Sequence, residues 1–204
     1  MTSGDLDRSV GTPPLDQASD DDLVRAALDG AAIGDTRALD VLIERHQGHV
    51  RANCEFLAGE AETARDLAQE VMVKAYFGLD TYRGEASFRT WIRRVKVNHC
   101  LNHLARARPE FVDVDSGASR GDEAMSVSPD VDVEAPERRN AVAAVLGELT
   151  ETLRVPLVLR DVDGFSYDEI AGQLDIKLSA AKMRVARGRE QFREVWTRRF
   201  GDAR

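Results

Sequence analysis

The sequence has few of the residues that cross-link or interrupt a fold. Only two cysteines, Cys54 and Cys100, occur among 204 residues, which excludes a disulfide framework and fits a reducing compartment. There is no run of 18 apolar residues to form a membrane span, and the first residues lack the basic and then apolar order of a secretory signal. We therefore expect a soluble, cytoplasmic protein that does not insert into membranes.

The chain also has few aromatic residues, glycines and prolines. Aromatic residues make up 6% of the chain, and there are only 15 glycines and 6 prolines. Alanine, leucine, arginine and glutamate are abundant instead, and all of them favour helices. The composition and the length together predict an all-α fold of two small helical domains.

Charge is distributed unevenly along the chain. The overall net charge of −8 argues against a uniformly basic surface for nucleic acid. Residues 36–108 and 141–204 are nevertheless mildly basic, at +3 and +1, whereas residues 1–35 and 109–140 each carry −6. This alternation predicts four parts: a disordered extension at 1–19, a first domain at 20–108, an acidic flexible linker at 109–140 and a second domain at 141–204.

One helix of the first domain has a polar face that is a candidate contact surface. The helix expected at residues 62–77 is apolar on one side, and its other side presents a candidate contact surface that includes Asp66, Gln69 and Glu70. Before it, Asp35 is expected to cap a helix that Gly59 ends.

The last helix of the first domain, capped by Ser87, combines cations and amides behind an aromatic loop. Such groups neutralise phosphates, stack on an unpaired base and read base edges, so the pattern favours single-stranded nucleic acid. The alternative is that Tyr82, Phe88 and Trp91 belong to the core and that the arginines form a solvated face. For Phe88 and Trp91 we prefer the core interpretation. The polar residues of this helix include Arg89, Arg93, Arg94, Lys96, Asn98 and Asn102.

The second domain has the order of a helix-turn-helix. Ser166 and Glu169 have the spacing of a capping box, and the residues from Asp175 to Leu178 are expected to form a tight turn. Ser179 is expected to cap the last helix. A basic second helix of this kind enters a major groove, where its cations meet phosphates and guanine edges, so we predict duplex DNA binding. Its cations are Lys182, Arg184, Arg187, Arg189 and Arg193.

Short motifs in both domains resemble regions 2 and 4 of bacterial RNA polymerase sigma factors. They read DLAQE at 66–70, YRG at 82–84, FRTWI at 88–92, VN at 97–98 and GFSYDEIA at 164–171. Because no other sigma region is present, the sequence is similar to the extracytoplasmic-function (ECF) group of the sigma-70 family. The resemblance covers residues 37–106 and 141–197.

The resemblance implies a sigma factor that binds core RNA polymerase, recognises −35 and −10 promoter elements and melts the −10 region. It implies no enzymatic activity, no cofactor and no metal. Asp66, Gln69 and Glu70 would contact the clamp helices of the β′ subunit. The −10 residues would be Tyr82, whose loop receives a flipped base, together with Arg94, Lys96, Asn98 and Asn102.

The same resemblance assigns the second domain to the β flap of the polymerase and to duplex DNA. An anti-sigma factor is a further expected partner. The −35 residues would be Ser179, Lys182, Met183, Arg184, Ala186 and Arg187.

Two other classes of function stay open at this point. In a helix-turn-helix regulator that acts without polymerase, the 62–77 helix would simply present a solvated face. A zinc site is the second, since His99 and His103 lie four residues apart with Cys100 between them, and His46 and His49 form another pair. No HExxH or CxxC motif accompanies these histidines.

Overall fold

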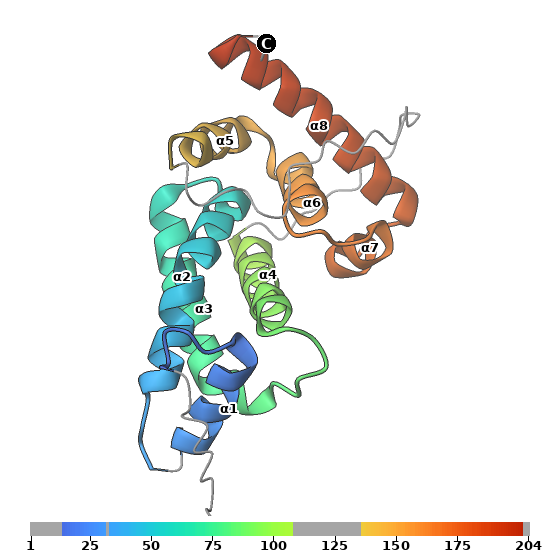
Figure 1. The fold of residues 1–204 in the computed structure, drawn as a ribbon. Coiled ribbons are helices and arrows are strands. Elements are labelled where there is room, and N and C mark those ends of the chain that lie inside the picture. Colours follow the sequence, from blue (N-terminus) through green and yellow to red (C-terminus); the bar gives the residue numbers. More distant parts are fainter. Residues whose placement is uncertain (1–13, 32, 108–135, 202–204) are drawn as a thin grey trace, which may run out of the picture.

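The computed structural model describes residues 14–31, 33–107 and 136–201. All regular secondary structure in these ranges is helical, which confirms the predicted all-α class (Figure 1). None of the described helices is long and apolar enough to cross a bilayer. The helices are α1 (Asp20–Ala31), α2 (Arg37–Ala58), α3 (Ala61–Gly78), the short 3-10 turn η1 (Leu79–Thr81), α4 (Phe88–Ala107), α5 (Pro136–Glu148), α6 (Glu151–Asp161), α7 (Tyr167–Leu174) and α8 (Leu178–Phe200).

The expected linker and extension fall mostly outside the described residues. Residues 1–13 and 108–135 belong to that part of the chain. Helix α5 begins at Pro136, before the residue 141 at which the second domain was expected to start. Proline suits the first turn of a helix because its missing N–H is not needed there.

The first unit consists of α1 to α4, with α2 packed against the other three helices. Apolar residues recur along α2 every three or four positions, and Leu42, Val50 and Phe56 are fully buried. Gly59 ends α2 in the left-handed conformation, as predicted, and its N–H donates to Glu55 O at 2.9 Å. The N-cap is Thr36 rather than Asp35.

The second unit consists of α5 to α8, and its helix-turn-helix has the predicted starting cap. Ser166 Oγ accepts from the N–H of Glu169 at 3.2 Å, and the Glu169 carboxylate accepts from the N–H of Ser166 at 2.8 Å. Asp175 follows α7 with φ 51°, a left-handed conformation that aspartate adopts more readily than most residues, at the predicted turn. The predicted Ser179 cap is wrong: α8 begins at Leu178, and Lys177 is the N-cap, without a side-chain bond.

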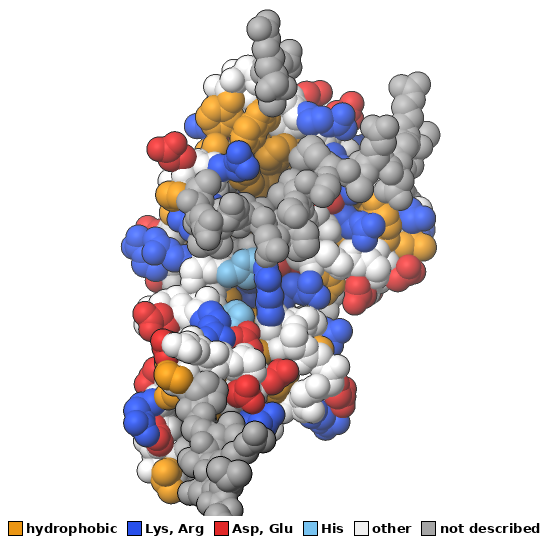
Figure 2. Space-filling model, in the orientation of Figure 1, with side chains coloured by type: hydrophobic (Ala, Val, Ile, Leu, Met, Phe, Trp, Pro, Cys, Tyr) orange, Lys and Arg blue, Asp and Glu red, His pale blue; other side chains and the backbone are white. Residues whose placement is uncertain are grey.

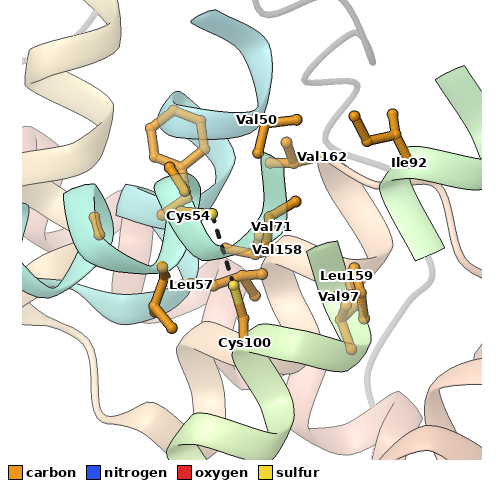
Figure 3. Packing of buried hydrophobic residues seen from close by; sticks show 14 of the residues in the cluster. Val50, Cys54, Leu57, Val71, Ile92, Val97, Cys100, Val158, Leu159 and Val162 are labelled. Atoms are coloured by element: carbon orange, nitrogen blue, oxygen red, sulfur yellow. Dashed lines mark hydrogen bonds between the residues drawn. The ribbon is translucent and has the colours of Figure 1, made fainter. Parts of the chain in front are cut away.

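The two units share one apolar core. Figure 3 shows Val158 and Val162 of α6 in the same buried cluster as Cys54, Val97 and Cys100 of the first unit. The two cysteines are free thiols in contact, with Cys100 Sγ donating to Cys54 Sγ at 3.7 Å. Helix α6 therefore packs on α2 and belongs to the same buried cluster as α4, the helix that carries most of the candidate −10 residues.

Candidate nucleic-acid and protein-binding surfaces

The polar face of α3 is an open surface. Asp66, Gln69 and Glu70 are all exposed and line a hollow of about 490 Å³ together with Val73 and Lys74. Their spacing of three and four residues puts these side chains on one side of the helix. The structure thus brings together the three residues that the sequence singled out for polymerase binding.

Exposed apolar side chains on the same helix were missed by the sequence reasoning. Val73 and Phe77 are 49% and 75% exposed. They follow Asp66 and Glu70 by seven residues, the spacing of two helical turns, and this spacing was the signal that could have revealed them. Clustered exposed apolar groups beside polar ones are typical of a protein-binding surface.

A stripe along α4 carries three of the predicted −10 residues. Arg94, Asn98 and Asn102 are exposed and four residues apart, so they lie one above the other on one face of the helix. A cation and two amides in a row can contact a phosphate backbone and neighbouring base edges. We call these three residues the α4 stripe.

Lys96 does not belong to that stripe, in contrast to the expectation from sequence. It lies two residues along from Arg94, which turns it to the other side of the helix, and it is 1% exposed. Its Nζ donates to Asp163 Oδ1 at 2.5 Å. In this conformation Lys96 faces the second unit and not solvent.

Tyr82 lies at the turn before α4, half-buried within an aromatic cluster. Its hydroxyl donates to Ala86 O at 2.6 Å, and its ring centroid is 6.1 Å from that of Phe88 and 5.8 Å from that of Trp91. Burial, and then the nearby charge of Asp21, raise the pKa of Tyr82, so the hydroxyl is a neutral donor at pH 7. Phe88 is buried and Trp91 half-buried, as preferred for these two aromatics.

The exposed face of α8 carries part of the predicted −35 set. Ser179, Lys182 and Arg187 are exposed, and Ala186 is half-buried. Lys182 Nζ lies 5.8 Å from the centroid of the Tyr167 ring, a cation–π contact from the neighbouring helix. These residues remain where a DNA groove can reach them.

Three other α8 residues lie elsewhere than expected. Met183 and Arg184 are buried, at 7% and 6% exposure, and so do not lie on the open face of the helix in this conformation. Arg189 is also buried, and its guanidinium makes two bonds to the Asp161 carboxylate, at 2.9 and 2.7 Å. The sequence pattern showed a basic helix but not which of its cations the fold itself uses.

Charges of both signs are mixed on the face of the molecule seen in Figure 2. In the view of Figure 2, Lys and Arg side chains are interspersed with Asp and Glu and do not form one continuous basic face. This agrees with the net charge of −8.

The histidines of the zinc alternative are used differently. His99 Nε2 lies 2.6 Å from Glu70 Oε2, and His46 Nε2 lies 2.7 Å from Asp20 Oδ2. Within the described ranges, no group of three or more His, Cys, Asp or Glu side chains could hold a metal ion.

The helix-turn-helix of the second unit is a DNA-binding motif, so the fold places the chain in a class of DNA-binding proteins. Within this class, the chain matches the family models "Sigma-70 region 2" at residues 42–110 and "Sigma-70, region 4" at residues 139–192. The chain belongs to the sigma-70 family, as an ECF-type member. It is a sigma factor that directs promoter-specific transcription.

Individual relatives agree with this placement. The chain is 36% identical over 169 residues to the RNA polymerase sigma-H factor of Pseudomonas aeruginosa, which covers 77% of this chain and 85% of the relative. It is 32% identical over 164 residues, with the same two shares, to the ECF RNA polymerase sigma-E factor of Escherichia coli K12. A regulator that never meets polymerase would not account for the match to region 2.

The fold also resembles a solved structure. CnrH, in complex with the cytosolic domain of CnrY, superposes with a TM-score of 0.51 at 24% identity, over 89% of this chain and 99% of that chain. This likeness supports the fold alone.

Proposed function

We propose that the α3 face is the surface that docks on core polymerase, at the clamp helices of the β′ subunit. Asp66, Gln69 and Glu70 supply charge and hydrogen bonds, and Val73 and Phe77 supply apolar area. A protein interface of this composition has a desolvated apolar centre with polar groups around it. The chain acts by binding and not by catalysis, and it works in the cytoplasm, where polymerase is found.

The −10 element is bound by the α4 stripe together with Tyr82. Flipping a base and separating strands costs a few kcal/mol per disrupted step. Stacking on an aromatic ring and contacts to phosphates offset that cost. The single observation that carries this assignment is the exposed row of Arg94, Asn98 and Asn102, directly after the turn that holds Tyr82.

The −35 element is read by α8 in the major groove, while the second unit contacts the β flap. The residues that face outward there are Ser179, Lys182, Ala186 and Arg187. Lys182 and Arg187 are suited to phosphates and guanine edges, and the small Ala186 to apolar contact with a thymine methyl group. An anti-sigma factor is a further proposed partner, which the sequence resemblance implies.

The test is promoter opening by the reconstituted holoenzyme. We expect Asn98→Ala to lower the fraction of open complex by about tenfold, since that factor is about 1.4 kcal/mol and one base contact supplies about 1–3 kcal/mol. Closed-complex binding should change little, because duplex contacts come mainly from α8. Permanganate footprinting for the open complex and mobility shift for the closed complex measure the two stages.

His103→Ala is the matched control, because His103 is exposed on the same helix but lies off the stripe. It should leave both stages unchanged. Equal losses of closed and open complex in Asn98→Ala would contradict the assignment of the stripe to the −10 element.

A further inference from the structure

We infer that Asp163 is a latch that holds the free chain closed, with the second unit covering Lys96 until the two units separate. The closed state itself stands on the contacts between the units. Its meaning for promoter binding rests on the proposed function, since the sequence resemblance places Lys96 among the −10 residues.

Asp163 lies just after α6 and makes its contacts across the boundary between the units. Its Oδ1 accepts from Lys96 Nζ at 2.5 Å and from Asn53 Nδ2 at 3.3 Å, and its backbone O accepts from the Arg93 guanidinium at 2.6 Å. Lys96 and Asp163 are each 1% exposed. One residue of the second unit thus occupies two cations of the helix that carries the α4 stripe.

The chemistry of this contact imitates that of a nucleic acid. A carboxylate beside a lysine, with a carbonyl oxygen beside an arginine, presents oxygens where a phosphate would present its own. A strand that used Lys96 and Arg93 would have to displace Asp163. The closed chain and the strand therefore compete for the same two cations.

The latch is incompletely satisfied, which favours opening. Among the described residues, Asp163 Oδ2 and Arg93 Nε are buried without a hydrogen-bond partner. A buried polar atom left unpaired is costly, and a buried ion pair contributes little net stability over apolar packing. Water can hydrogen-bond to these atoms when the units separate. This hydration offsets part of the free-energy cost of exposing the apolar area between the units.

Arg154 of α6 forms a second anchor between the units. Its guanidinium donates to Leu57 O at 3.2 Å and to Ala58 O at 3.0 Å, two carbonyls at the end of α2. Such carbonyls have no partner within their own helix and carry the negative end of its dipole. Arg154 thus holds the closed state from a point separate from Asp163.

The spacing of promoter elements requires the closed state to open. Elements at −35 and −10 lie about 25 base pairs apart, or about 85 Å along B-form DNA. In the closed chain, the two units are in direct contact. The 28 residues at 108–135 that join them could span at most about 95 Å, so the chain length permits the separation.

The test is lysine acetylation of the free full-length chain, read by mass spectrometry. The sequence has only four lysines, and Lys74, Lys177 and Lys182 are exposed, so they serve as references within each sample. In the wild-type chain we expect Lys96 to react at least about tenfold more slowly than these three, because only the open population reacts. In Asp163→Asn its rate should rise to within about threefold of theirs.

Asp161→Asn is the matched control. Asp161 is buried near the same end of α6, but its partner Arg189 lies within the second unit. This variant weakens the second unit without touching the latch, so Lys96 should stay protected. Circular dichroism establishes that each variant is folded. If Asp163→Asn does not fold, Arg154→Ala, which removes the second anchor, replaces it as the test of the latch.

Two results would overturn the latch. One is a wild-type Lys96 that reacts as fast as the exposed lysines. The other is continued protection of Lys96 in the folded Asp163→Asn variant, or in Arg154→Ala if Asp163→Asn does not fold. Because neither polymerase nor DNA is present, these results are independent of the footprinting test of the proposed function.

Discussion

At the start of α7, Ser166 and Glu169 form two reciprocal hydrogen bonds, which give a partner to the backbone N–H of each residue. The bonds from the N–H and the hydroxyl of Ser166 lower the pKa of Glu169, so its carboxylate stays charged. Ser166→Ala should reduce the free energy of unfolding by about 1 kcal/mol, the usual value of an N-cap. Urea unfolding measures this. Ser166→Thr, which keeps the hydroxyl, is the control, and equal stability of the two variants would contradict the role of the cap.

His49 makes stability depend on pH near neutrality. It is half-buried, and burial, followed by the charges of Lys96 and Arg89, lowers its pKa below the usual 6.5, while Asp163 acts in the opposite direction. The unfolded chain then binds the proton more readily than the folded chain. This contribution is complete above pH 6.5 and is lost as the pH falls below it.

We therefore expect the urea midpoint to decrease as the pH is lowered from 7.5 to 5.5. The decrease should be smaller in His49→Gln. Glu169, with its lowered pKa, affects stability only below its ordinary value of 4.5, outside this window. If His49→Gln lost as much stability between pH 7.5 and pH 5.5 as the unmodified chain, another group would be responsible for the pH dependence.

At the scale of the helices, α6 and α8 pack tightly against each other at Gly188. A Cβ there would lie 2.9 Å from Leu153 O and 3.2 Å from Leu157 Cβ, and a backbone carbonyl has little freedom to move. Gly188→Ala should lower the free energy of unfolding by roughly 1–3 kcal/mol. Denaturant unfolding of the full chain measures it.

Gly172 of α7 provides the control, because nothing lies within 4 Å of a Cβ placed on it. Gly172→Ala should raise stability by about 0.5–1 kcal/mol through helix propensity alone. A Gly188 variant as stable as the Gly172 variant would show that the two helices do not pack as described.

Local sequence was sufficient for most helix ends and insufficient for a few. The Ser166 cap, the end of α2 at Gly59 and the turn at Asp175 each depend on residues within four positions, so the pattern alone identified them. Ser179 has the right chemistry for a cap but lies within the first turn of α8, one residue after its start. Asp35 lies one residue before the N-cap Thr36, yet its Oδ1 accepts from the backbone N–H of Arg37, the first residue of α2, at 3.1 Å.

At the scale of the whole molecule, distant contacts decide which cations are available. Lys96 lies four residues from both Ile92 and Cys100, on the apolar side of α4, but its partner Asp163 is 67 residues away and could not be identified from local sequence. Arg189 likewise pairs with Asp161 on another helix. Periodicity predicted the α3 face and the α4 stripe, whereas tertiary packing removed Lys96, Met183 and Arg184 from the surface.

Docking on polymerase is also tested on the whole molecule. Asp66→Lys reverses a charge at the α3 face and should raise the Kd for core polymerase by about tenfold or more, because like charges then meet across the interface. The free chain should keep its stability to within about 0.5 kcal/mol, since Asp66 is exposed. Fluorescence anisotropy with labelled chain measures the Kd.

Glu44→Lys makes the same charge change at an exposed position on α2, outside the α3 hollow. It should bind polymerase as the unmodified chain does. Equal weakening by both variants would mean that net charge, and not the α3 face, governs the association.

The burial of both thiols has a practical consequence. Cys54 and Cys100 are the only cysteines of the chain, and both are wholly inaccessible in the core between α2 and α4. While the two units stay together, buried thiols in these apolar surroundings are inert toward alkylating reagents. One new cysteine at a surface position of either unit is therefore a unique attachment point for a fluorophore or spin probe, with the native pair left intact.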